Sequence, residues 1–193
     1  EEDTFDLGPD EEEDFKVTFN GQTRLSADLS YDFTLTATVT NVGMLDWPEA
    51  LASNASVDGD LNIAMFGMVD LDISDTSTRT MGGGEEVTIT FQFQNNGNDD
   101  DKIRVSITNT AELEAAGFTF PGGTSVAEDV SEGGVSTVRE LVVRSPSEVS
   151  ADERYQVTFQ AQSENDNDAP VSESSIPVQL EASNTAGGLG GGL

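Results

Sequence analysis

The sequence predicts an all-β fold, an antiparallel β-sandwich with an extended N-terminal tail. Apolar and polar residues alternate with a period of two in many short segments, as in strands with one face on a core and the other on water. Clusters of Gly, Asn, Asp and Pro separate these segments, and such clusters favour turns. About nine strands at this spacing are typical of a sandwich or a barrel.

The individual strands are expected where apolar residues occupy alternate positions. One helix is also predicted over 111–117 (AELEAAG), ending at Gly117, while residues 43–60 lack periodicity and are interpreted as a long loop. In chain order, the expected strands contain Phe15/Val17/Phe19, Phe33/Leu35/Ala37/Val39, Leu61/Ile63/Met65, Val69/Leu71/Ile73, Val87/Ile89/Phe91/Phe93, Ile103/Val105/Ile107, residues 138–143, Tyr155/Val157/Phe159/Ala161 and Ile176/Val178/Leu180.

Composition divides the chain into three parts. Residues 1–14 form an acidic, extended N-terminal tail, residues 15–182 carry the expected strands, and residues 183–193 are a Gly-rich C-terminal tail. Within the middle part, 15–66 holds strands that could be a sheet extension, a truncated second sandwich or part of one jelly roll. A single domain is favoured, because about 55 residues alone make a marginal core.

Charge and missing residue types exclude many functions. The 193 residues include 37 Asp and Glu, 8 Lys and Arg, no His and no Cys, for a net charge of −29. Catalysis by His or Cys, Cys/His zinc sites and disulfides are therefore impossible. The negative field repels nucleic acid, and no apolar run is long enough to span a membrane. We do not expect an enzyme.

The same charge predicts the environment. Lys is scarce, carboxylates occur throughout, and this composition resembles that of proteins from extreme halophiles. At molar salt the Debye length falls to about 3 Å, so the self-repulsion that would destabilise a compact fold largely vanishes. The chain begins at Glu1 rather than Met, which suggests removal of a secretory signal. We therefore expect an extracellular or cell-surface protein.

Two stretches carry a family resemblance: GGGEEVTITFQFQNNGNDDDKIRVSITN (82–109) and DERYQVTFQAQSENDNDAPVSESSIPVQL (152–180). Together they resemble the immunoglobulin-like domains, of the cell-adhesion-related CARDB type, in secreted and surface proteins of haloarchaea. The resemblance covers about 69–182 and implies an immunoglobulin-like portion there, with a jelly roll as the alternative for the whole sandwich. Residues 85–94, 102–109, 153–163 and 172–181 would then be strands B, C, F and G.

That assignment places two acidic loops at one end of the sandwich. Clustered carboxylate and amide oxygens suit calcium, which takes six to eight oxygen ligands. The favoured alternative is a pair of solvated turns in a protein that is acidic everywhere, with no cofactor at all. The candidate calcium ligands are Asn95, Asn98, Asp99, Asp101, Glu164, Asp166 and Asp168.

Two further features bear on assembly and modification. Phe5 and Leu7 lie on one side of a short extended segment, which could add a strand to a neighbouring subunit. A disordered acidic tail is the alternative interpretation. Asn54, in Asn-Ala-Ser, is a glycosylation sequon if the protein is secreted.

These observations predict a structural subunit of an extracellular assembly, such as a cell-surface filament or pilus of a halophile. Subunits would polymerise through sheet edges, with donor-strand exchange by the N-terminal tail as one route. Two alternatives remain open: a viral capsid or spike protein with a jelly-roll fold, and a monomeric adhesion or ligand-binding module. The expected partners are copies of the same chain.

Overall fold

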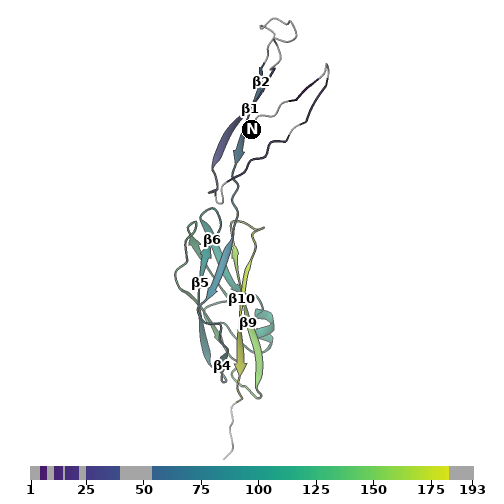
Figure 1. Cartoon of the computed structure of the whole chain (residues 1–193). Coiled ribbons are helices and arrows are strands. Elements are labelled where there is room, and N and C mark those ends of the chain that lie inside the picture. The colour runs from purple at the N-terminus through teal and green to yellow at the C-terminus, as the bar shows by residue number, and fades with distance from the viewer. Residues whose placement is uncertain (1–4, 8–10, 15, 22–24, 40–53, 183–193) are drawn as a thin grey trace, which may run out of the picture.

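The computed structural model describes residues 5–7, 11–14, 16–21, 25–39 and 54–182 (Figure 1). The described residues form ten strands and one short helix, joined by turns and irregular segments, which confirms the predicted all-β class. The elements are β1 (Ser30–Thr38), β2 (Asn54–Asn62), β3 (Val69–Ile73), β4 (Arg79–Met81), β5 (Glu86–Asn95), β6 (Asp101–Ile107), α1 (Thr110–Ala115), β7 (Ser125–Val130), β8 (Arg139–Arg144), β9 (Glu153–Ser163) and β10 (Ser172–Leu180).

Strands β3 to β10 form a two-layer sandwich. One sheet has the order β4-β10-β9-β6-β7 and the other the order β3-β5-β8. All pairs are antiparallel except β4 with β10, which run parallel. The strands β5, β6, β9 and β10 take the B, C, F and G positions of an immunoglobulin-like sandwich, as predicted, and the order is not that of a jelly roll.

The core lies between the two sheets. Phe91 of β5 and Phe159 of β9 are fully buried, and their rings meet across the layers with centroids 6.2 Å apart. Leu113 of α1 is also fully buried. The helix ends at Ala115, and Gly117 follows with a φ of 89°, a conformation that glycine adopts at little cost.

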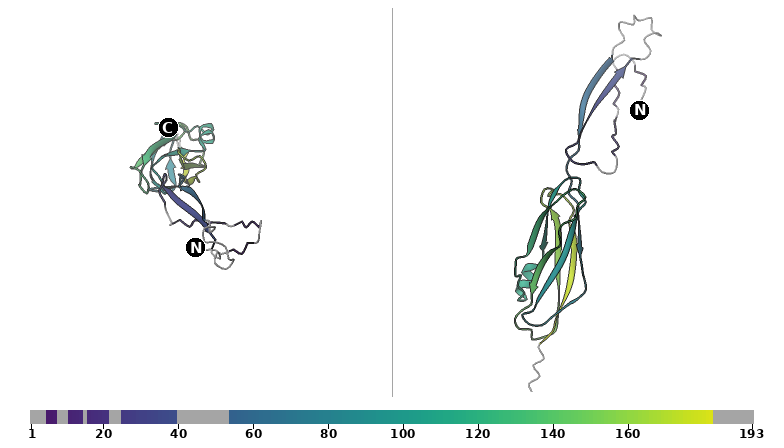
Figure 2. Two further views of the ribbon diagram at one scale, coloured as in Figure 1. Left: turned by 90° about the horizontal axis from the view of Figure 1, so that it is seen from above. Right: turned by 90° about the vertical axis from the view of Figure 1, so that its left-hand side faces the viewer.

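Strands β1 and β2 form a separate two-stranded antiparallel sheet (Figure 1, Figure 2). We call residues 25–39 and 54–64 the arm. It projects from one end of the sandwich along the long axis of the molecule, and β10 ends at the opposite end.

The prediction of a strand around Phe15, Val17 and Phe19 is wrong for the part that the structure describes. Residues 16–21 form no strand, and Phe15 lies outside the described residues. Phe19 instead packs its ring against Phe33 of β1, with centroids 4.9 Å apart. A side-chain contact has replaced the expected backbone pairing.

The interpretation of 43–60 as a loop is wrong over 54–60, which belongs to β2. The alternating positions there are Ala55, Val57 and Gly59, whose small side chains give a weak hydrophobic signal. The strand predicted around Leu61 to Met65 in fact ends at Asn62. The sequence did not predict the short strands β4 and β7. Strand β4 spans only three residues, and β7 is largely half-buried on both faces, so neither shows a clear alternation of apolar and polar residues.

Among the described residues, no helix is long and apolar enough to cross a membrane.

Candidate functional site

The best-defined polar site of the molecule is the place where the arm meets the sandwich. Three loops of the sandwich lie there, residues 96–100, 131–134 and 164–171, and they contact the base of the arm through backbone and side-chain hydrogen bonds. We call these loops, with residues 25–28 and 63–68, the joint.

Asn98 binds the base of the arm on both sides, before β1 and after β2. Its Nδ2 donates to the carbonyls of Leu25 and Ala64, both at 3.0 Å, and its Oδ1 accepts from the Phe66 N–H at 2.7 Å. Its own carbonyl accepts from the Ala27 N–H at 2.8 Å. The side chain is buried, so the loss of these bonds would leave buried polar groups without partners.

Asn95 gives the loop its shape. Its Nδ2 donates to the carbonyls of Asp99 and Val130, and its Oδ1 accepts from the Gly97 N–H. A Cβ on Gly97 would lie 2.6 Å from the Phe66 carbonyl oxygen, so only glycine permits this close approach of the loop to the arm.

The loop before β10 also contacts residues 65–68, which connect the arm to β3 and which we call the linker. The Asp166 carboxylate accepts from the Gly67 N–H at 2.8 Å, and its second oxygen accepts from the Asp168 N–H at 3.0 Å. Ser163 Oγ accepts from the Asp166 N–H at 2.9 Å. A Cβ on Gly67 would lie 2.7 Å from the Ser163 Cβ, which fixes how closely the linker packs.

Glu164 links this loop to β6. It forms ion pairs with Arg104 and, at 3.4 Å, with Lys102, and its N–H donates to the Lys102 carbonyl. The hydrogen bond from Arg104 is the main cause that lowers the pKa of Glu164 below its ordinary 4.5, with Lys102 adding to it. The carboxylate therefore remains charged over a wide pH range.

Asp101 is the unusual member of this group. It is 2% exposed, on the inward face of β6 at its first residue. Neither of its carboxylate oxygens has a hydrogen-bond partner among the described residues. A buried, unpaired carboxylate is costly unless water, a proton or a cation satisfies it.

The candidate calcium ligands thus occupy one end of the sandwich, as their strand positions predicted. Most of them already have protein partners: Asn95, Asn98, Glu164 and Asp166 are hydrogen-bonded or ion-paired as described, and Asp99 Oδ1 accepts from the Asp100 N–H. Asp168 is exposed. Among the described residues there is no group of three or more acidic side chains placed to hold a metal ion. A calcium site here stays a prediction that rests on Asp101.

The other candidate residues lie elsewhere. Phe5 and Leu7 are 44% and 55% exposed, in a stretch without regular secondary structure. Asn54 is the first residue of β2, opposite Thr38, and is exposed near the tip of the described part of the arm. An exposed sequon is accessible to a glycosylating enzyme.

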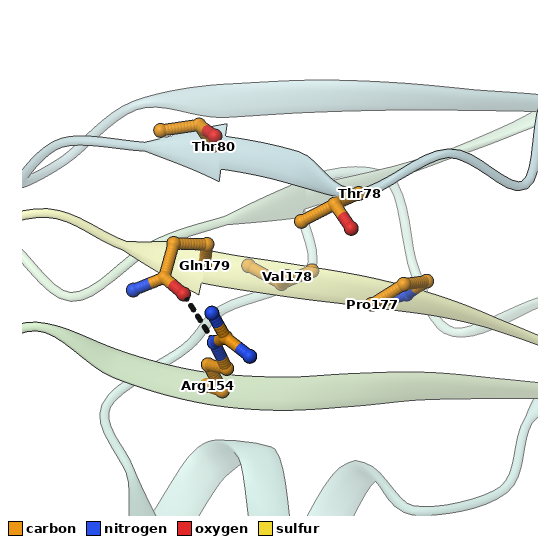
Figure 3. A pocket seen from close by; sticks show the side chains of 6 residues that line it. All are labelled: Thr78, Thr80, Arg154, Pro177, Val178 and Gln179. Atoms are coloured by element: carbon orange, nitrogen blue, oxygen red, sulfur yellow. Dashed lines mark hydrogen bonds between the residues drawn. The ribbon is translucent and has the colours of Figure 1, made fainter.

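A shallow depression lies on the β4-β10-β9 side of the sandwich (Figure 3). It has a volume of about 260 Å³ and is lined by Thr78, Thr80, Arg154, Pro177, Val178 and Gln179. The guanidinium of Arg154 donates to Gln179 Oε1 at 2.7 Å. The Arg154 side chain is therefore held in place by a hydrogen bond within the protein.

The sequence pattern predicted that the two acidic loops of the joint lie together, but not that they bind residues 25–28 and 63–68. The NNG motif at 95–97 predicts a turn, and amide side chains next to a glycine are typical of loops that bond their own backbone. That Asn98 would bind the linker 32 residues before it could not be read from the local pattern.

No protein-family model and no curated protein matches the sequence. Among solved structures, the chain is similar to the CooA pilin subunit from enterotoxigenic Escherichia coli, with 17% identity, a TM-score of 0.41, and coverage of 59% of this chain and 97% of the pilin.

Two other solved structures are similar to this chain at comparable TM-scores. The family 123 glycoside hydrolase from Clostridium perfringens matches at 7% identity and a TM-score of 0.43, over 59% of this chain and 27% of the hydrolase. A PapD-like domain of human CEP192 matches at 13% identity and a TM-score of 0.36, over 58% of this chain and 84% of that domain. Likeness at these levels says nothing about function.

Proposed function

We propose that the chain is a structural subunit of an extracellular assembly, a cell-surface filament or pilus of a halophile. The observation that carries this proposal is the arm, a two-stranded sheet that leaves one end of a well-packed sandwich. A two-stranded sheet alone is marginally stable in water, so an arm of this length is suited to contact another molecule.

Sheet edges provide the second kind of contact. Within the described residues, β1 and β2 pair only with each other, so each has an edge with unpaired N–H and C=O groups. Such edges are templates for an added strand. The N-terminal segment with Phe5 and Leu7 is a candidate for that strand, since both side chains are exposed and lie at alternate positions in the sequence.

The acidic surface would set the conditions for assembly. Two copies that each carry a charge of −29 repel each other in dilute salt. At molar NaCl this repulsion reaches only about 3 Å, and short-range contacts can form. The surface then prevents nonspecific association at low salt without blocking specific contacts at high salt.

The remaining expectations belong to this proposal. The assembly is a homopolymer without a catalytic role, located outside the cell, and Asn54 near the arm tip is a site for a glycan. The capsid or spike alternative was based on a jelly-roll fold, and the immunoglobulin-like strand order does not favour it.

Electron microscopy of the purified chain tests the proposal. Regular filaments are expected in molar NaCl and dispersed monomers in dilute buffer, and monomers at every salt and protein concentration would contradict it. Deletion of residues 1–13 tests the route: filaments that persist without these residues would exclude donor-strand exchange by the tail while leaving the structural role intact.

A further inference from the structure

The arm has two chemically opposite faces. Because neighbouring residues in a strand point to opposite sides, the register of β1 with β2 sorts the residues into two sets. We call one set the apolar face, in which every cross-strand pair is uncharged: Tyr31 opposite Leu61, Phe33 opposite Gly59, Leu35 opposite Val57, and Ala37 opposite Ala55.

The reverse face is polar and acidic. It pairs Asp32 with Asp60, and Thr34 with Asp58, whose carboxylate accepts from the Thr34 hydroxyl at 2.6 Å. Two carboxylates directly opposite each other are destabilising unless water and salt screen them. This face therefore belongs in solvent.

Among the residues that the structure describes, the apolar face of the arm is only partly covered. Phe33 lies across Gly59 and is contacted by Phe19, so the middle of the face is half-buried. Val57 is 61% exposed and Tyr31 is 45% exposed. A sheet with an apolar face needs a second layer, and the sandwich supplies that layer for β5 but not for the arm.

Charge indicates what the second layer is. The apolar face carries no charge, on a molecule with a net charge of −29. A basic partner would be drawn to the acidic surface instead, and an anionic membrane would be repelled by it. Two copies of this chain, which repel each other over charged surfaces, can approach closely where neither presents a carboxylate.

Size supports a repeated contact rather than an isolated dimer. Two strands of this length make a face of about 30 by 10 Å, or roughly 300 Å². A stable interface needs about 800 Å² from each partner. One such contact is weak, and it becomes effective when the same molecule also makes other contacts in a polymer.

We infer that the apolar face of the arm is buried against a second copy of this chain. The inference rests on the proposed function, because it supplies a subunit contact for the assembly. It predicts that residues on the apolar face lose solvent exposure as the protein concentration rises, while their neighbours on the polar face do not.

Cysteine labelling tests this directly, since the chain contains no Cys of its own. Val57→Cys places a thiol on the apolar face, and Thr36→Cys places one on the polar face, next to Leu35, the cross-strand partner of Val57. In molar NaCl, labelling of Val57→Cys by a maleimide should slow about tenfold from low to high micromolar protein. Labelling of Thr36→Cys should stay constant within about twofold.

A charge-matched pair gives an independent test. Val57→Asp and Thr36→Asp add the same carboxylate to opposite faces. Val57→Asp should weaken self-association about a hundredfold in sedimentation experiments, because both copies would bury an unpaired charge. Thr36→Asp should leave self-association unchanged. Circular dichroism checks that the sandwich is folded in both variants.

The outcomes separate this inference from the proposed function. Filaments with Val57→Cys fully reactive would overturn the inference and leave the filament role standing. Protected Val57→Cys in small oligomers without filaments would support the inference and contradict the filament role. Protection that appears only with phosphatidylcholine vesicles, at any protein concentration, would overturn the inference in favour of a lipid surface.

Discussion

The arm and the sandwich use the same sequence pattern with opposite results. In β5 the alternating residues Ile89, Phe91 and Phe93 are buried in the core, and each is at most 1% exposed. In β1 the alternation of Tyr31, Phe33 and Leu35 leaves each side chain half-buried or exposed. Both strands are about equally long and regular. Alternation thus predicts a strand and its apolar face, and only a second layer decides whether that face is buried.

The largest expected contrast comes from matched aromatic substitutions. Phe91→Ala should lower the free energy of unfolding by about 3–5 kcal/mol, because it leaves a cavity in a close-packed core. Phe33→Ala should lower it by less than about 1 kcal/mol in the monomer, since the arm contributes little to global stability. Denaturant unfolding in molar NaCl measures both. Equal losses would mean that arm and sandwich form one core.

The second prediction concerns the joint, where the arm is held to the sandwich. Asn98→Ala removes three side-chain hydrogen bonds, two to Leu25 and Ala64 at the base of the arm and one to Phe66. Loss of a buried partner costs about 1–3 kcal/mol, so local opening should increase about 10- to 100-fold. Hydrogen exchange at the Ala27 amide reports this opening, because its own bond is to the Asn98 backbone.

The exposed Asn165 provides the control for that experiment. Asn165→Ala should leave exchange at Ala27 unchanged. Unchanged exchange in Asn98→Ala as well would show that the arm is held by other contacts.

Replacement of Asp101 should change the free energy of unfolding less than the substitutions above, and in the opposite direction. Asp101→Asn removes a buried charge, so in the presence of a chelator we expect it to raise the free energy of unfolding by about 1 kcal/mol. Asp129→Asn, at an exposed position on the neighbouring strand, should have little effect. A loss of stability in Asp101→Asn would contradict this account.

The same variant tests the predicted calcium site. If calcium binds at Asp101, it raises the unfolding temperature of the natural chain but not of Asp101→Asn. An equal response in both chains would exclude Asp101 as a ligand.

The smallest expected effect is the pH dependence of Glu164. Its pKa is lower in the folded than in the unfolded chain, so the ion pairs stabilise the fold above about pH 4.5 and this contribution disappears as the pH falls further. At moderate salt, Glu164→Gln should cost less than about 1 kcal/mol at pH 7 and almost nothing near pH 3. Glu173→Gln on β10 is the exposed control. A cost that stayed constant with pH would point to packing instead of charge.

Much of the sandwich could be predicted from the sequence, because its strands combine large apolar residues with clear turns. The positions of β5, β6, β9 and β10 follow from such segments, and so does the meeting of the two acidic loops at one end. Most of strand β2 was missed, since Ala55 and Gly59 have too little apolar surface to reveal a strand, and only its end around Leu61 was predicted. The joint was missed because Asn98 binds residues distant in sequence, and local patterns hold no information about that pairing.

The parallel pairing of β4 with β10 has a mechanical consequence. The chain enters β4 from the side of the arm, and β10 leaves toward the opposite end of the molecule. A pull applied between these two ends slides Arg79–Met81 lengthwise against Val178–Leu180. The hydrogen bonds between them then bear the load together and must break at once, so this short pairing would act as a lock against stretching.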